Sequence, residues 1–161
     1  MGPSMDTQIL TDLFTHTMAS AEILGADADF RETLRATLKR LPEPKIGKHG
    51  QIQEWVEDSD EPEPGHRHMS HLFALHPGTQ ITLRGTPELA KGARAVLDRR
   101  LAHGGGHTGW SRAWMVNFWA RLEEAELAYE NLLALLRKST SPNLFVSART
   151  SNTGSVMGVA S

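Results

Sequence analysis

Two adjoining stretches decide the fold of this chain: WSRAWMVNFWARL over residues 110–122 and EEAELAYENLLALLR over residues 123–137. In the first stretch, apolar side chains occur on every side of a helix, which is typical of a helix surrounded by protein. In the second, they fall on one stripe at helical spacing. That stripe consists of Ala125, Ala128, Tyr129, Leu132, Leu133 and Leu136. Together the stretches predict a helical hairpin with an inner and an outer member.

A similar pair of helices is predicted at the N-terminal end. Residues 5–24 carry Ile9, Leu10, Leu13, Phe14, Thr17, Ala21 and Leu24 on one face. Residues 29–41 follow with their own helical periodicity. Gly25 ends the first helix and Pro42 ends the second, because glycine favours helix C-termini and proline cannot continue a helix.

A third pair is predicted between these two. The apolar residues 69–75 indicate a brief buried helix, and Thr86-Pro87-Glu88 begins a longer one that runs to Leu101. Residues 42–68 are rich in proline and acidic side chains and form a long irregular loop. The sequence therefore predicts an all-α chain of about three helical hairpins.

Composition excludes several classes of function. The chain has 161 residues, a formal charge of −2 and 17 basic residues that are scattered, so we expect no nucleic-acid partner. No apolar run is long enough to span a bilayer, and we expect no membrane partner. Cysteine is absent, which removes disulfides and thiolate metal ligands. The opening residues 1–6 lack the features of a signal peptide.

Imidazole, indole and guanidinium groups gather just before two of the predicted helices. The first junction, residues 54–71, contains Glu54, Trp55, His66, Arg67, His68 and His71, and the second junction, residues 101–112, contains His107, Thr108 and Trp110. Helices joined by short turns alternate in direction, so the starts of the first, third and fifth helices lie at one end of the assembly. We therefore expect the two junctions to face a common mouth.

The histidines of these junctions allow two interpretations. Imidazole is a common zinc ligand, but the spacing matches no established helical zinc signature, so we predict no metal and no cofactor. A carbohydrate site explains more of the residues, because sugars offer hydroxyls to polar groups and apolar faces to indoles. The predicted binding residues are Glu54, Trp55, His66, Arg67, His68, His71, His107, Thr108 and Trp110. For His71, a buried histidine bonded to a backbone carbonyl is an equal alternative.

Glycoside hydrolysis requires two carboxyl groups across the scissile bond. Glu54 and Glu57 are the best placed in the loop, but their spacing does not show that any two carboxylates face each other. We interpret the other acidic side chains of the loop as solvated. The residues alone thus predict a polar pocket and no particular reaction.

Several segments resemble the α-L-fucosidases of glycoside hydrolase family 95. The segments are residues 5–10, Gln51 to Trp55, Glu61 to Leu72, His103 to Trp114, Asn131 to Thr140, and Asn143 to Phe145. They occur in the order and spacing of the family over about residues 2–145, which is more specific than any single motif.

The resemblance implies half of an (α/α)6 barrel, from a metal-free enzyme that hydrolyses α-1,2-linked and related L-fucosides by inversion. Residues 2–145 would be a partial catalytic domain. The family's general acid lies in a Ser-Pro-Glu-Asn motif and its base in a Gln-Ile-Asp-Gly-Asn-Phe-Gly motif, and neither occurs in this sequence. We therefore expect no catalytic residue in this chain and no activity of the chain alone.

Residues 146–161 depart from the family pattern and are expected to be an aberrant, disordered tail. The implied partners are a fucosylated glycan and the remainder of the catalytic domain. The compartment stays open, with a secreted or periplasmic parent enzyme expected. A different class of function is a non-catalytic helical module that binds a glycan or a protein. Such a module would be stable by itself, whereas a domain part would expose apolar faces.

Overall fold

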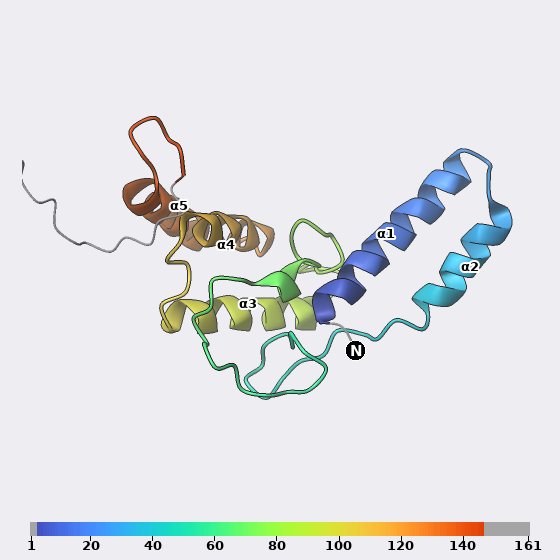
Figure 1. Ribbon diagram of the computed structural model, residues 1–161, viewed down its shortest axis with the longest axis horizontal. Helices are drawn as coiled ribbons and strands as arrows, with labels where there is room; N and C mark the ends of the chain where they lie inside the picture. Colours follow the sequence, from blue (N-terminus) through green and yellow to red (C-terminus); the bar gives the residue numbers. More distant parts are fainter. Residues whose placement is uncertain (1–2, 147–161) are drawn as a thin grey trace, which may run out of the picture.

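The computed structural model describes residues 3–146. Five α-helices and one turn of 3-10 helix make up its regular structure (Figure 1). They are α1 (Ser4–Ile23), α2 (Ala28–Leu38), the 3-10 turn η1 (Ser70–Leu72), α3 (Pro87–Ala102), α4 (Gly109–Arg121) and α5 (Ala125–Ser139). Within this part of the chain there is no β-strand, only the isolated bridges Ile46–Ile52 and Thr140–Val146. The all-α prediction is confirmed, and the arrangement is consistent with part of a helical barrel.

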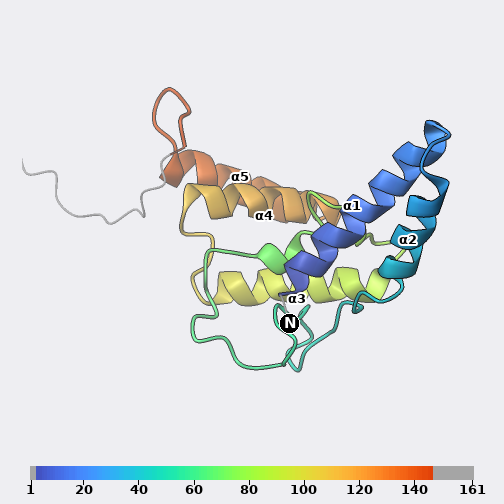
Figure 2. The same ribbon diagram turned by 45° about the vertical axis from the view of Figure 1, so that its right-hand side comes forward.

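Two of the three predicted hairpins form as expected. Helix α1 contacts α2, and α4 contacts α5. Figures 1 and 2 show α1 and α2 as an arm that projects from the rest, whereas α4 and α5 lie beside α3. In the third pair, residues 69–75 do not form the predicted α-helix. Only η1 forms, followed by turns in which Gly78 N donates to Phe73 O and Ile81 N donates to Ala74 O.

The hydrophobic core lies between α3, α4 and the segment that contains η1. Its fully buried side chains include Leu72, Leu75, Leu97, Phe118 and Trp119. Helix α3 starts as predicted, with Thr86 at the N-cap and Pro87 in the first turn, because proline needs no intrahelical partner for its nitrogen there. This core fixes η1, into which the first junction leads, and the ends of α3 and α4, which the second junction connects.

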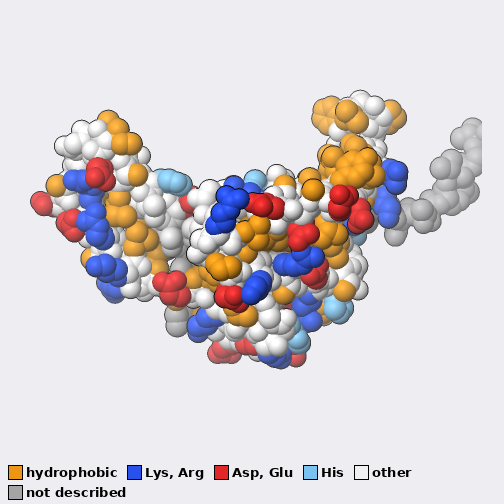
Figure 3. Space-filling view, turned by 180° about the vertical axis from the view of Figure 1, so that it is seen from behind, with side chains coloured by type: hydrophobic (Ala, Val, Ile, Leu, Met, Phe, Trp, Pro, Cys, Tyr) orange, Lys and Arg blue, Asp and Glu red, His pale blue; other side chains and the backbone are white. Residues whose placement is uncertain are grey.

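The apolar stripes of α1 and α5 are largely uncovered. On α1, Leu13 is 54% exposed and the stripe residues Ile9, Leu10 and Leu24 are exposed as well; the buried residues of this helix are Gln8 and Ala21. On α5, Tyr129, Leu132 and Leu136 are exposed. Figure 3 shows hydrophobic side chains reaching the surface on both the arm and the α5 side. Helical periodicity was thus correct, but much of each face that it marks is exposed within residues 3–146.

The long irregular loop predicted over residues 42–68 is confirmed. It runs beneath α3 in Figure 1 and is held by polar contacts of its own. Asp58 accepts a hydrogen bond from Lys48 N at 2.6 Å, and Asp60 pairs with both Lys48 and His49 at 2.9 Å. None of the helices in residues 3–146 combines the length and the hydropathy that crossing a bilayer would require.

Candidate functional site

The two junctions meet, as the alternation of helix directions predicts. The rings of His68 and Trp110 lie with centroids 5.0 Å apart, and the rings of His66 and His68 lie at the same separation, inclined by 38°. Met5 at the start of α1, Ser70 at the start of η1 and Trp110 at the start of α4 line one hollow. The expectation of a common mouth is therefore confirmed.

This hollow, which we call the aromatic pocket, has a volume of about 260 Å³. It is lined by Met5, His68, Met69, Ser70, Phe73, His76, Trp110, Trp114 and Phe118. Trp110, Trp114 and Phe118 follow one another along a face of α4 because residues four apart in a helix are neighbours. Trp110 is 47% exposed and Phe118 is buried, so the aromatic row runs from the surface into the core.

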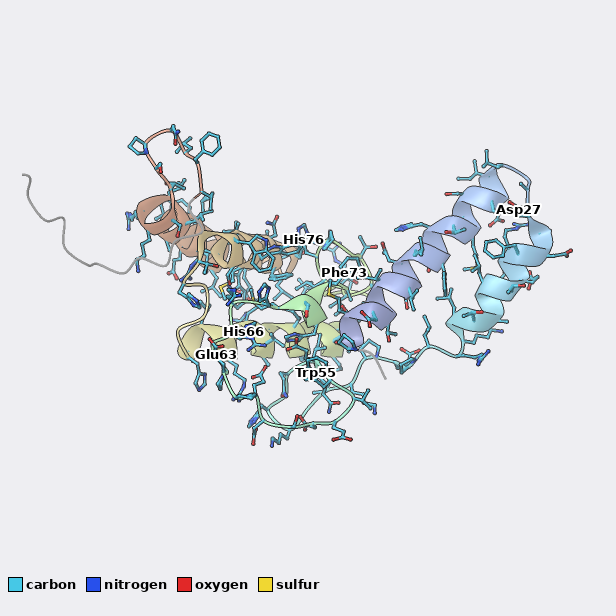
Figure 4. The ribbon with its side chains drawn as sticks, viewed as in Figure 1. Asp27, Trp55, Glu63, His66, Phe73 and His76 are labelled. Carbon is cyan, nitrogen blue, oxygen red and sulfur yellow. The ribbon has the colours of Figure 1, made fainter. Side chains whose placement is uncertain are left out.

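A second hollow, the carboxylate pocket, lies next to the first. Its volume is about 330 Å³, and it is lined by Glu54, Trp55, Ser59, Asp60, Glu61, Pro62, Glu63, His66 and Arg100. His66 lines this pocket, and the neighbouring His68 lines the aromatic pocket. The two imidazoles therefore form the boundary between the two pockets. Figure 4 shows the labelled Trp55, Glu63 and His66 along the loop that passes α3, and Phe73 and His76 on the α4 side.

Arg100, in the last turn of α3, organises the carboxylate pocket. Its side chain is 3% exposed, and its Nη2 lies 3.3 Å from Glu54 Oε2 and 2.9 Å from Glu61 Oε1. Its Nη1 donates to the backbone carbonyls of Glu63 and Pro64, both at 3.2 Å. The sequence indicated Glu57 beside Glu54, but Glu57 is exposed and the carboxylate that shares this guanidinium is Glu61. We had expected Glu61 to be a solvated loop residue, but it is paired with Arg100.

The ionisation of Glu54 reflects two opposing effects. Burial raises the pKa of its carboxyl above the usual value, and the Arg100 guanidinium and a hydrogen bond from Ser70 Oγ at 3.3 Å offset part of that rise. His71 lies on the other side, with its Nδ1 3.5 Å from Glu54 Oε2. Burial lowers the pKa of His71 to about 3, so this ring is neutral at pH 7.

His71 does not follow either sequence interpretation fully. It is 1% exposed, and its Nδ1 has no hydrogen-bond partner within the described residues, so it is not held by a backbone carbonyl. Its own carbonyl instead accepts a hydrogen bond from Gln8 Nε2 at 2.8 Å. The ring lies next to the Glu54 carboxyl group and lines neither pocket.

His68 stands at the pocket boundary, in surroundings that favour its neutral form. Burial lowers its pKa, and the neighbouring Arg67 and His66 lower it further. A neutral imidazole donates one hydrogen bond and accepts another, which suits it to a sugar hydroxyl.

Four of the nine predicted binding residues lie outside both pockets, namely His71, described above, and Arg67, His107 and Thr108. Arg67 and His107 are exposed, and His107 Nδ1 is 3.3 Å from the Gly104 carbonyl. Thr108 is buried as the N-cap of α4, where its side-chain oxygen accepts from Ser111 N at 3.2 Å. Glu54, Trp55 and His66 share the carboxylate pocket, whereas His68 and Trp110 share the aromatic pocket.

The turn between α3 and α4 depends on its glycines. Gly104 and Gly106 have φ values of 84° and 74°, in the left-handed region that glycine adopts without strain. Gly65, in the first junction, packs directly on the His103 carbonyl, so that no side chain fits there. Within residues 3–146, no three histidine or acidic side chains are grouped closely enough to hold a metal ion.

Arg100 and Glu61 were not among the predicted site residues. A signal for Arg100 was present, since it follows Ala93, Val96 and Leu97 on the inward face of its helix. A cation on an apolar face is expensive to bury unless it is paired, which points to acidic partners elsewhere in the chain.

The chain belongs to the glycosyl hydrolase family 95 catalytic domain family, whose model matches residues 1–161. It is 42% identical over 127 residues to Alpha-L-fucosidase 2 of Arabidopsis thaliana, which covers 78% of this chain and 15% of that protein. It is 29% identical over 143 residues to Probable alpha-fucosidase A of Aspergillus niger (86% and 18%) and 32% identical over 136 residues to Probable alpha-fucosidase A of Aspergillus oryzae (78% and 19%).

These findings confirm the family resemblance and make the chain, by family, part of a glycosidase. The chain spans between 15% and 19% of the length of these relatives. The prediction for the segment 146–161 stays a prediction, because all of it except Val146 lies outside the described residues.

Proposed function

We propose that this chain forms part of the L-fucoside-binding mouth of a family 95 α-L-fucosidase that acts by inversion on α-1,2-linked and related L-fucosides of glycans. The observation that carries the proposal is the contact between the rings of His68 and Trp110, whose centroids lie 5.0 Å apart, which joins the two junctions into one mouth. A half-exposed indole offers a plate for the apolar face of a sugar ring, and the adjacent imidazoles and Glu54 offer partners for its hydroxyls.

The exposed apolar faces of α1 and α5 support the proposal that the chain is part of a larger catalytic domain. The leucines of α1 and the Tyr129, Leu132 and Leu136 face of α5 are apolar and exposed, which favours packing against further helices. A self-sufficient helical module would cover such faces. We propose the remainder of the catalytic domain as what packs there, with a fucosylated glycan as the ligand.

Binding of L-fucose tests the site. We expect L-fucose, added to the purified chain, to change its tryptophan fluorescence saturably, and we expect Trp110→Ala to weaken that binding by about tenfold because the stacking plate is lost. Tyr129→Ala, which removes an exposed aromatic ring from α5, should leave the affinity unchanged. Equal affinity for D-fucose, or full affinity in Trp110→Ala, would contradict the assignment.

The isolated 161-residue chain is expected to release no nitrophenol from 4-nitrophenyl α-L-fucoside. The family resemblance assigns the general acid and the base to motifs that this sequence does not contain. Glu54 and Glu61 do not replace them, because both bind one guanidinium, whereas an acid and a base act from opposite sides of the scissile bond. Release of nitrophenol that Glu54→Gln abolishes would refute this expectation.

A further inference from the structure

Arg100 is connected to both junctions at once. Through Nη1 it holds the carbonyls of Glu63 and Pro64, the two residues that precede Gly65 and His66. Its own carbonyl accepts a hydrogen bond from Gly105 N at 2.7 Å, inside the turn that leads to Trp110. A single residue therefore fixes the backbone on either side of the mouth.

Both terminal nitrogens of the guanidinium are occupied by protein oxygens. Four protein oxygens, from Glu54, Glu61, Glu63 and Pro64, lie within hydrogen-bond or ion-pair distance of Nη1 and Nη2. The remaining donor, Nε, is buried and has no partner among the described residues. A planar fork with donors in fixed directions can hold four acceptors in this way, whereas an ammonium on a flexible stem cannot reproduce the geometry.

We propose that Arg100 is a positioning residue of the sugar site, which orients Glu54 and the His66 backbone toward the mouth without itself contacting the sugar. This role rests on the proposed function, since it supposes that a sugar binds at the mouth. It differs from that of a cation that only stabilises the fold, because it predicts effects on the ionisation of Glu54 and on affinity that persist in folded variants.

The charged groups around Glu54 decide what the loss of Arg100 would do. Glu54 is faced by Arg100 from α3, by Glu61 and His66 from the loop, and by His71 from η1. Arg100 is the principal group that lowers the pKa of Glu54 against the effect of burial. Removing this cation leaves burial and Glu61, which raise that pKa, opposed only by the smaller effects of Ser70 and His66, so the titration midpoint of Glu54 moves upward.

The experiment compares Arg100→Met, Arg100→Lys and Arg94→Met in the full chain. Arg94 is a matched control, because it lies on the same helix in an ion pair with Glu124, and it contacts neither junction. The first measurement is the titration of the Glu54 carboxyl by ¹³C NMR in the absence of sugar. The second is the affinity for L-fucose by tryptophan fluorescence.

In Arg100→Met we expect a higher Glu54 midpoint and affinity for L-fucose reduced about tenfold or more, the usual scale for losing a hydrogen bond to a charged group. In Arg100→Lys the midpoint should be close to that of the unmodified chain, while the affinity stays reduced, because the charge is kept and the fork is lost. Arg94→Met should change neither.

An unchanged Glu54 midpoint in folded Arg100→Met, or full affinity in Arg100→Lys, would overturn the proposal. If Arg100→Met does not fold, the affinity of Arg100→Lys decides. If the unmodified chain does not bind L-fucose, the proposed function fails. The Glu54 titration then still decides whether Arg100 sets the ionisation of this carboxyl.

Discussion

Replacing Gly65 with alanine is expected to lower the free energy of unfolding by about 3 kcal/mol, the upper range for inserting a carbon into a closely packed site. A Cβ at this position would collide with the carbonyl oxygen of His103, and it would lie 2.8 Å from the carbonyl carbon and 3.3 Å from Gly105 N. These are backbone atoms, and hydrogen bonds between Arg100 O and the amides of His103 and Gly105 hold them in place. The two junctions can accept the new carbon only by separating.

Urea denaturation followed by far-UV circular dichroism measures this effect. Gly85→Ala is the control, because its Cβ would meet only the Thr82 hydroxyl, at 2.9 Å, which ends an exposed side chain whose hydrogen bond from Gly85 N can be replaced by one to water. We expect that control to remain within about 0.5 kcal/mol of the unmodified chain. A Gly65→Ala chain with an unchanged urea midpoint would show that the junctions are not in contact as described.

Trp119→Ala is expected to lower the free energy of unfolding by about 3–5 kcal/mol, the range for removing a large aromatic side chain from a core. Trp119 is fully buried between α4 and the core residues of α3, and Arg94 lies over its ring at 5.6 Å. Its removal leaves a cavity that the surrounding helices cannot close without moving.

Trp110→Ala is the matched control, since it makes the same substitution on the same helix at a half-exposed position. We expect this control to lose about 1 kcal/mol or less in urea denaturation, although it is expected to bind L-fucose about tenfold more weakly. Equal destabilisation by the two substitutions would mean that Trp110 belongs to the core and is not available to a ligand.

Periodicity was sufficient to predict the helices of this chain. The apolar stripe of residues 123–137 corresponds to α5, and the Thr86-Pro87 start corresponds to the beginning of α3. The segment 69–75 was less predictable, because a short apolar run does not distinguish a helix from buried turns. Periodicity also could not show that the α1 stripe is exposed, since a pattern reports which face is apolar and not what packs against it.

The candidate site could be predicted only in part, because a sequence pattern does not show which distant residues come into contact. His68 and Trp110 could be placed at one mouth from the alternation of helix directions alone. The role of Arg100 could not be predicted, because its side chain contacts residues far away in the sequence. Pro64 is 36 positions from Arg100, and Glu54 is 46 positions from it. His107 was included because it lies in the second junction, but its ring lies outside both pockets.

The buried side-chain amide of Gln8 in α1 connects the projecting arm to the backbone next to the candidate site. Gln8 Nε2 donates to the carbonyl of His71, and Gln8 Oε1 accepts from Ala74 N, both at 2.8 Å, so the first turns of the arm are tied to the strip of backbone behind Glu54. A neighbouring surface that shifts the arm would therefore displace the imidazole against which Glu54 rests. We therefore expect packing at the outer leucines to influence the ionisation of Glu54 through this side chain and through the hydrogen bond from Ser4 N to Glu54 O.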